Sequence, residues 1–96
     1  MKLTVAICSW NRSHLLRLTL EQMTKLRIPQ DVEWELLVVD NNSTDDTQEV
    51  AQSFTTRLPI RVLFEPSPGK SHALNHATNK AMGDYILWTD DDVLVD

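Results

Sequence analysis

The sequence predicts an α/β fold, in which helices cover both faces of an open, mostly parallel and twisted sheet. Four short apolar runs rich in β-forming residues support this prediction, at positions 3–7, 35–39, 60–64 and 85–88. Segments with helical periodicity separate these runs, so strand and helix alternate along the chain. The first, second and fourth runs lack polar alternation, which is typical of parallel strands that are covered on both faces.

The 96 residues, 42% of them hydrophobic, suffice for one small domain with its own core. The formal net charge is −5 and basic residues form no cluster, so a nucleic-acid partner is not expected. Cys8 is the single cysteine, which rules out an internal disulfide and favours the reducing cytoplasm. No apolar run approaches the roughly 20 residues of a membrane-spanning helix, although a full-length protein could work at the inner face of a membrane.

Three segments carry apolar residues at helical spacing, and each follows a serine that is suited to cap a helix. We expect the first helix after Ser13, and the second from Ser43, whose spacing to Asp46 resembles a capping box. The third helix is expected to follow Ser71 and to end before Gly83, a glycine placed as a C-terminal cap. The apolar stripes of the three helices are Leu16, Leu20 and Met23; Val50, Ala51 and Phe54; and Ala73, Ala77 and Ala81.

Ligands of open parallel sheets bind beyond the carboxyl ends of the strands, so the residues that follow each apolar run form the candidate site. These stretches span residues 8–12, 40–43, 65–70 and 90–92. The chain has only two glycines, and it contains neither the Gly-x-Gly-x-x-Gly fingerprint of dinucleotide-binding sheets nor a P-loop. A dinucleotide cofactor is therefore not expected.

Three consecutive carboxylates, Asp90, Asp91 and Asp92, follow the last apolar run, although like charges repel each other. Neighbouring residues of a strand point to opposite faces, so Asp90 and Asp92 are expected to share one side. Two carboxylates at the ligand edge of a sheet form a hard oxygen site suited to Mg²⁺ or Mn²⁺, which keeps positions open for phosphate oxygens. A solvated strand end is the alternative interpretation.

Two histidines, His72 and His76, lie four residues apart, as zinc-binding histidines of a helix do. No third ligand is identifiable, and no glutamate stands beside the first histidine. We therefore expect a structural or solvent-facing role for both, and for His14.

The chain resembles the nucleotide-binding half of the family 2 glycosyltransferases in three segments, TVAICSWNR, LLVVDNNSTDDT and GKSHALNHATNKAMGDYILWTDDDV. These segments have the order and spacing of that family and cover essentially the whole chain. The resemblance implies a Rossmann-like sheet of the GT-A type and a nucleoside-diphosphate-sugar donor, with a UDP-sugar favoured. It also implies a divalent cation, Mn²⁺ or Mg²⁺, bound through an Asp-x-Asp motif, and sugar transfer to an acceptor with inversion at the anomeric carbon.

By this resemblance, Cys8, Ser9 and Trp10 at the end of the first strand line the nucleoside pocket. Trp10 stands where the family often has tyrosine, although a large residue that only fills the turn would look the same. Asp40 matches the first acidic residue after the second strand, whereas Asn41 replaces a second aspartate that reads the base in many members. Because an amide both accepts and donates, Asn41 could still pair with the N3–H and O4 edge of uracil.

The resemblance also covers positions around the diphosphate. Gly69 corresponds to the glycine before the third helix, where the backbone approaches the donor, and Lys70 beside it could face the diphosphate. Asn75 fits an arginine–asparagine pair that is usual in that helix, but Leu74 replaces the arginine. Lys70 or Arg12 would have to supply the missing positive charge.

At the last strand, the resemblance assigns Asp90 to the ribose or sugar and, with Asp92, to the metal, while Asp91 contributes to donor binding. The general base that an inverting transfer needs lies far beyond this motif in the family, in the acceptor-binding part. Residues 1–96 are therefore expected to be a donor-binding part that ends before the general base. We expect this part to bind nucleotide and metal weakly without transferring sugar unaided.

Three alternatives were weighed against this interpretation. A phosphotransferase of the haloacid dehalogenase type carries its Asp-x-Asp motif near the N-terminus, unlike this chain. A nucleotidyltransferase of related fold tends to begin with a glycine-rich basic loop after the first strand, which is absent here. A non-catalytic nucleotide-binding module is the alternative from another class. An incomplete domain would also expose apolar surface, through which the chain could self-associate.

Overall fold

The computed structural model describes residues 2–90, with the main chain alone at Lys70 and Asp90. Within this range the expected alternation of strands and helices is confirmed. The elements in chain order are β1 (Lys2–Ser9), α1 (Ser13–Met23), β2 (Glu33–Asp40), α2 (Thr47–Gln52), β3 (Ile60–Phe64), α3 (Lys70–Lys80) and β4 (Tyr85–Asp90).

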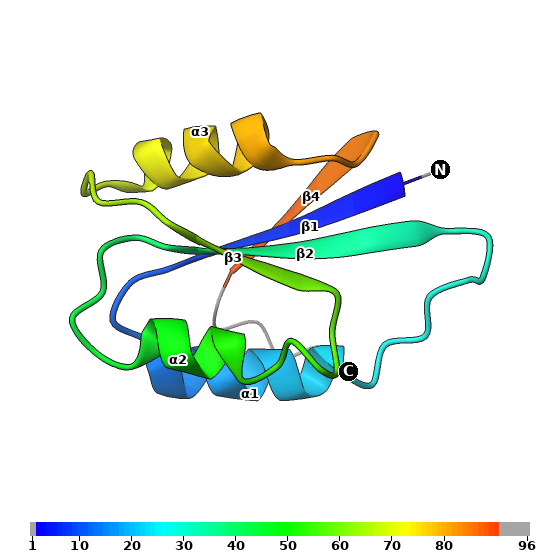
Figure 1. The fold of residues 1–96 in the computed structure, drawn as a ribbon, viewed down its shortest axis with the longest axis horizontal. Coiled ribbons are helices and arrows are strands. Elements are labelled where there is room, and N and C mark those ends of the chain that lie inside the picture. Colours follow the sequence, from blue (N-terminus) through cyan, green and yellow to red (C-terminus); the bar gives the residue numbers. More distant parts are fainter. Residues whose placement is uncertain (1, 91–96) are drawn as a thin grey trace.

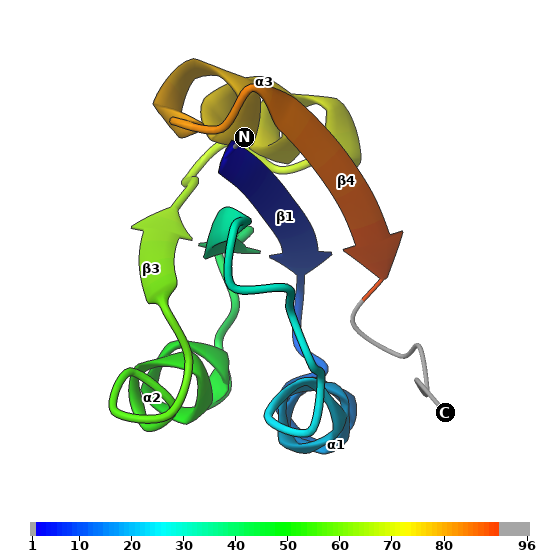
Figure 2. The same cartoon turned by 90° about the vertical axis from the view of Figure 1, so that its right-hand side faces the viewer.

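The sheet has the strand order β3-β2-β1-β4, and every neighbouring pair is parallel. Helices α1 and α2 cover one face and α3 covers the other, which gives three layers (Figures 1 and 2). The predicted fold class is thereby confirmed. Because β4 lies on the far side of β1 from β2, the chain changes direction between β1 and β4, and ligands of such sheets bind at a switch point of this kind.

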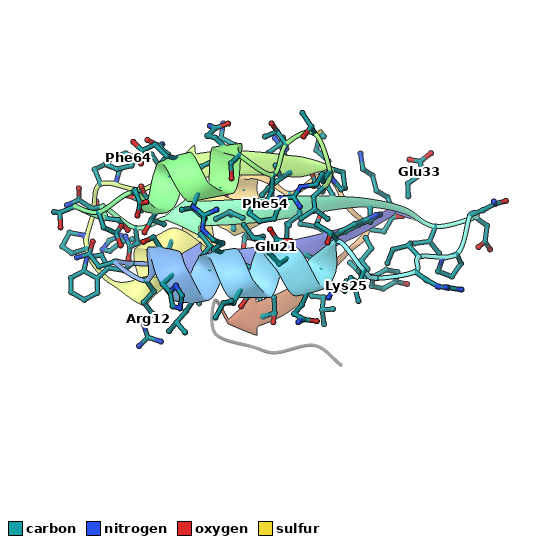
Figure 3. All side chains as sticks on the ribbon, turned by 90° about the horizontal axis from the view of Figure 1, so that it is seen from below. Arg12, Glu21, Lys25, Glu33, Phe54 and Phe64 are labelled. Atoms are coloured by element: carbon teal, nitrogen blue, oxygen red, sulfur yellow. The ribbon has the colours of Figure 1, made fainter. Side chains whose placement is uncertain are left out.

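Two hydrophobic clusters hold the layers together, one on each face of the sheet. The larger cluster joins the sheet to α1 and α2, and Figure 3 shows Phe54 between these two helices. The smaller cluster lies under α3, where Ala73 and Ala77 are completely buried. Such small side chains let α3 approach the sheet closely, as its alanine stripe predicted. The buried members on the sheet side of this smaller cluster are Ala6, Leu37 and Val39.

The expected helix caps are wrong in position. The residues that precede the helices are Arg12, Asp46 and Gly69, and no side chain of these three makes a capping hydrogen bond. Ser13 and Ser71 therefore lie inside α1 and α3 rather than in front of them. Ser43 lies four residues before α2, where its hydroxyl accepts a hydrogen bond from another loop instead of capping the helix.

Asp45 supplies the contacts that the expected caps would have made. Its carboxylate accepts hydrogen bonds from the backbone N–H and the hydroxyl of Thr47, at the start of α2, and from the N–H of Ser13, at the start of α1. The distances are 3.0 Å for the Thr47 nitrogen and 3.2 Å for the Ser13 nitrogen. One carboxylate thus satisfies the first turns of two neighbouring helices, which both favour a negative charge.

Gly83 does not end α3, because that helix stops at Lys80. Its role is a close contact with β1. A Cβ atom at Gly83 would lie 2.6 Å from both the backbone nitrogen and the hydroxyl oxygen of Thr4, nearer than real Cβ atoms approach. Glycine is therefore required here so that the connection from α3 to β4 can pass β1.

A buried carboxylate lies near the amino ends of the strands. Glu35 is 6% exposed and accepts hydrogen bonds from the Thr4 hydroxyl at 2.7 Å, the Met82 N–H at 2.7 Å and the Arg61 guanidinium at 2.9 and 3.1 Å. Arg61 also donates to the carbonyl oxygen of Lys80. Burial raises the pKa of the Glu35 carboxyl, but the hydrogen bonds from Met82, Thr4 and Arg61 outweigh it and hold the pKa below its usual range. The network ties three strands to the end of α3, opposite the ligand edge.

Among the helices of residues 2–90, none has the length and apolar character needed to cross a bilayer.

Candidate functional site

The carboxyl ends of the strands meet at one edge of the sheet. In the register of β1, Ser9 is paired with Asp40 of β2, and Cys8 is paired with Asp90 of β4. The loops that follow β1, β2 and β3 gather at the left of Figure 1, and we call this side of the molecule the carboxyl edge. Figure 3 places Arg12 and Phe64 at this end and Glu33 at the opposite end.

At the end of β1, buried and exposed residues follow each other directly. Ser9 is buried in the sheet, Cys8 is half-buried, and Trp10 is 61% exposed. A tryptophan that only filled the first turn would be covered by its neighbours, so the exposure of Trp10 argues against that interpretation. Its indole is instead available at the edge where a ligand would bind.

Asn11 joins the loop after β1 to the loop after β2. Its side-chain oxygen accepts a hydrogen bond from the Thr44 N–H at 2.7 Å, and its own N–H donates to the Ser43 hydroxyl at 3.0 Å. Asn11 and Asn42 both have positive φ angles, 51° and 62°, a conformation that asparagine tolerates better than most residues. The sequence analysis gave Asn11 no role of its own, although asparagine in a loop is a known signal for this conformation.

Asp40 is almost completely buried, with 3% of its surface exposed. One carboxylate oxygen accepts a hydrogen bond from the Ser43 N–H at 3.0 Å, and its backbone oxygen accepts one from the Glu65 N–H at 2.9 Å. Asp40 therefore shapes the turn after β2 and connects it to the end of β3.

Asn41 is 8% exposed and contacts both neighbouring strand ends. Its backbone N–H donates to the Ser9 carbonyl at 2.9 Å. Its side-chain nitrogen donates to the carbonyl oxygens of Ser67, at 2.8 Å, and of Glu65, at 3.3 Å. Both amide hydrogens are thereby used inside the protein. The expected donation to O4 of uracil has no hydrogen left, whereas acceptance through the amide oxygen remains open to a ligand.

The loop between β3 and α3 contains a residue pair that the sequence analysis did not connect. One oxygen of the Glu65 carboxylate accepts a hydrogen bond from the Ser67 N–H at 2.9 Å. The other oxygen lies 3.4 Å from the Nδ1 atom of His76, close enough for an ion pair but without hydrogen-bond geometry. His76 is thus turned toward this loop, consistent with the expected structural role.

The other expected residues of this region differ in how the structure places them. Gly69 has a φ of 112°, which only glycine adopts readily, and it comes directly before α3. Asn75 is exposed on α3, and Arg12 is exposed just before α1. The Lys70 side chain lies outside the described part of the structure.

The acidic triplet is described only at its first residue. The main chain of Asp90 ends β4, whereas Asp91 and Asp92 lie outside the described residues. Within the described part, no three or more His, Cys, Asp or Glu side chains gather into a group that could hold a metal ion. Carboxylates are nevertheless the donor type that Mg²⁺ and Mn²⁺ prefer, so the residue types at Asp90 and Asp92 fit such an ion.

Electrostatically, Asp45 is the perturbed carboxyl of this edge. Burial raises the pKa of its carboxyl, but the hydrogen bonds from the Thr47 hydroxyl, the Thr47 N–H and Ser13 outweigh it and hold the pKa below its usual range. Asp45 therefore carries a negative charge at neutral pH, next to the first turns of α1 and α2.

The sequence matches the family described as glycosyl transferase family 2 over residues 4–96. The chain belongs to this family. As a family 2 glycosyltransferase sequence, it is 30% identical over 94 residues to the poly(ribitol-phosphate) β-N-acetylglucosaminyltransferase TarS of Staphylococcus aureus, covering 96% of this chain and 16% of TarS. Membership in this family decides against a dehalogenase-type phosphotransferase and against a nucleotidyltransferase.

Two solved structures of the family share the observed fold. The crystal structure of TarS 1–349 in complex with UDP has a TM-score of 0.86 and 28% identity, covering 96% of this chain and 28% of that chain. The mannosyltransferase PcManGT from Pyrobaculum calidifontis, in complex with GDP-Man and Mn²⁺, has a TM-score of 0.86 and 31% identity, with the same coverage. The sheet is thus the GT-A sheet that the resemblance implied. This chain spans well under a third of the length of either protein.

Proposed function

We propose that the chain binds a nucleoside-diphosphate sugar and that the protein to which it belongs transfers this sugar to an acceptor. The observation that carries the proposal is the strand register, which sets Ser9 beside Asp40 and Cys8 beside Asp90 at one edge of the sheet. Relatives support it, because TarS has been crystallised with UDP and with UDP-GlcNAc. A UDP-sugar is the donor that we favour.

We propose that the nucleoside lies across the ends of β1 and β2. Cys8 and Ser9 would line its pocket, and the exposed indole of Trp10 offers a surface for stacking. The buried carboxylate of Asp40 keeps this turn in shape. The amide oxygen of Asn41 would accept the N3–H of uracil, because its two amide hydrogens are already bonded to the loop after β3.

The diphosphate is proposed to lie toward α3 and β4. Gly69 allows the backbone to approach it, and Lys70 or Arg12 would supply a positive charge, while Asn75 and Asp91 contribute to donor binding. Asp92 and Asp90 would hold a divalent cation, as relatives crystallised with Mn²⁺ suggest. Such an ion stabilises the negative charge that develops on the leaving β-phosphate.

Titration calorimetry with UDP and GDP, each with and without Mn²⁺, tests this proposal. We expect Mn²⁺ to tighten the binding of UDP, and Asp92→Asn to remove this effect because a carboxylate ligand is lost. Asp31→Asn, in an exposed turn before β2, is the matched control and should behave as wild type. UDP binding that is indifferent to both Mn²⁺ and Asp92→Asn would contradict the metal site.

A nucleotide-binding module without turnover is the second candidate, since the general base is expected beyond Asp96. Metal-dependent UDP binding by the whole protein, with no transfer to any acceptor, would favour it. Inversion at the anomeric carbon, cytoplasmic localisation at or near the inner face of a membrane, and the identity of the acceptor stay predictions of the family resemblance and the composition.

A further inference from the structure

The loop between β3 and α3, residues 65–69, is held by side chains rather than by a ladder of backbone hydrogen bonds. Pro66 and Pro68 have no N–H to donate. The N–H of Ser67 between them donates to the carboxylate of Glu65, and the carbonyl oxygens of Glu65 and Ser67 accept from the amide of Asn41. The shape of this loop and the orientation of the Asn41 amide therefore depend on each other.

Glu65 connects this loop to α3. Its carboxylate is only 17% exposed, and its two oxygens face different partners, the Ser67 N–H and the Nδ1 atom of His76. The Nδ1 atom of His76 is buried and makes no hydrogen bond, so the Glu65 oxygen at 3.4 Å is the polar partner that it faces. A small shift of either side chain would bring the pair into hydrogen-bond range, which ends near 3.2 Å.

The orientation of the Asn41 amide decides what a ligand meets. An amide group is planar, and with both hydrogens directed at the loop carbonyls its oxygen is the group left for a ligand. Asn41 then acts as an acceptor only, as an aspartate would at the same position. A base must present an N–H there, which uracil does at N3.

We propose that Glu65 and His76 are positioning residues for base recognition, which hold the loop so that Asn41 meets the base as a hydrogen-bond acceptor only. The inference rests on the proposed function, because it specifies how the same site recognises its nucleotide. Neither residue contacts the base itself. They act through the loop carbonyls and the Asn41 amide.

The test compares the dissociation constants of UDP and of UDP methylated at N3, which lacks the donor hydrogen, at one fixed Mg²⁺ concentration. Wild type should bind the methylated nucleotide about 10-fold more weakly or worse, since a factor of ten corresponds to 1.4 kcal/mol, a typical loss for one well-placed hydrogen bond. Glu65→Ala and His76→Ala should reduce this ratio, because the loop and the amide lose their fixed orientation. Partial unfolding would instead weaken both nucleotides equally and leave the ratio unchanged.

Conservative variants separate positioning from packing. Glu65→Gln keeps an oxygen for the Ser67 N–H, and His76→Asn places an N–H near the original Nδ1 position, so both should retain most of the ratio. His72→Ala, an exposed histidine one turn earlier in α3, is the matched control and should match wild type. An unchanged ratio in both Glu65→Ala and His76→Ala would overturn the inference. Equal binding of the two nucleotides by wild type would overturn it while leaving the proposed function intact, and no binding of UDP would overturn both.

Discussion

Gly83 lies so close to β1 that a single added carbon atom would collide with the backbone of Thr4. Gly83→Ala should therefore destabilise the fold by about 1–3 kcal/mol, the usual cost of overpacking. Denaturant unfolding measures this change. Met82→Ala is the control, because the neighbouring side chain is 59% exposed and should cost less than about 0.5 kcal/mol. Equal stability of Gly83→Ala and wild type would show that the connection can move away from β1.

Glu35 is expected to make stability depend on acid pH. Its hydrogen bonds hold the pKa below the ordinary value of 4.5, so the folded state resists protonation more than the unfolded state does. The resulting stabilisation is complete above pH 4.5 and is lost as the pH falls through the lower, folded pKa. Glu35→Gln should be less stable at pH 7 by about 1–3 kcal/mol, because charged hydrogen bonds to buried groups are weakened.

The same variant should also lose part of the acid dependence, measured as the free energy of unfolding between pH 7 and pH 3. Glu33→Gln removes an exposed carboxyl from the same strand and serves as the control. If Glu35→Gln and wild type lost stability in parallel across this range, the network around Glu35 would not be the source of the effect.

Asn41 shows how far single residues could be predicted. The spacing after the second apolar run placed it correctly beside the end of β1, and the resemblance assigned it to the base. The use of its two amide hydrogens could not be predicted, because their acceptors are carbonyl groups 24 and 26 residues further along the chain. Glu65 escaped notice for the same reason, since its partner His76 belongs to a different element.

At the scale of elements, Asp45 is expected to stabilise α1 and α2 together. Asp45→Ala should cost about 1 kcal/mol, a typical value for a lost helix cap, as judged by thermal or denaturant unfolding. Asp46→Ala is a close control, because Asp46 precedes α2 directly but its side chain makes no capping hydrogen bond. A greater loss with Asp46→Ala than with Asp45→Ala would contradict the assignment.

The four strands could be predicted because buried parallel strands are continuous apolar runs, and the observed strands contain all of those runs. The helix starts could not be predicted to the residue. Serine caps helices often enough that Ser13, Ser43 and Ser71 all suited the pattern, yet a contact between two loops decided the outcome. Asp45 reaches both α1 and α2 only because these helices are neighbours in space.

For the whole molecule, alternation of strands and helices predicted a parallel sheet with two covered faces, but the order β3-β2-β1-β4 came from the structure alone. Strand order is set by which crossover passes over which face, and local sequence patterns carry little of that information. The metal ligands depend most on the family resemblance, since Asp91 and Asp92 lie outside the described residues.

Apolar side chains of β4 and the turn before it are expected to support self-association of the chain. Tyr85 and Leu87 are 64% and 56% exposed, and they lie on the same face of a strand that ends the described sheet. Sedimentation should show a mass that rises with concentration for wild type and stays monomeric for Leu87→Lys. Leu18→Lys, at an exposed leucine of α1, should still associate. A monomeric wild type at high concentration would contradict this prediction.

The central claim is that a nucleoside diphosphate binds at the carboxyl edge of the sheet, and NMR of the backbone amides during titration with UDP and Mg²⁺ tests it most directly. We predict saturable shifts that are largest at Ser9, Trp10, Asn41 and Gly69, and negligible shifts at Gly83 near the opposite edge. Shifts centred on the amino ends of the strands, or no saturable shifts at any UDP concentration, would contradict the account.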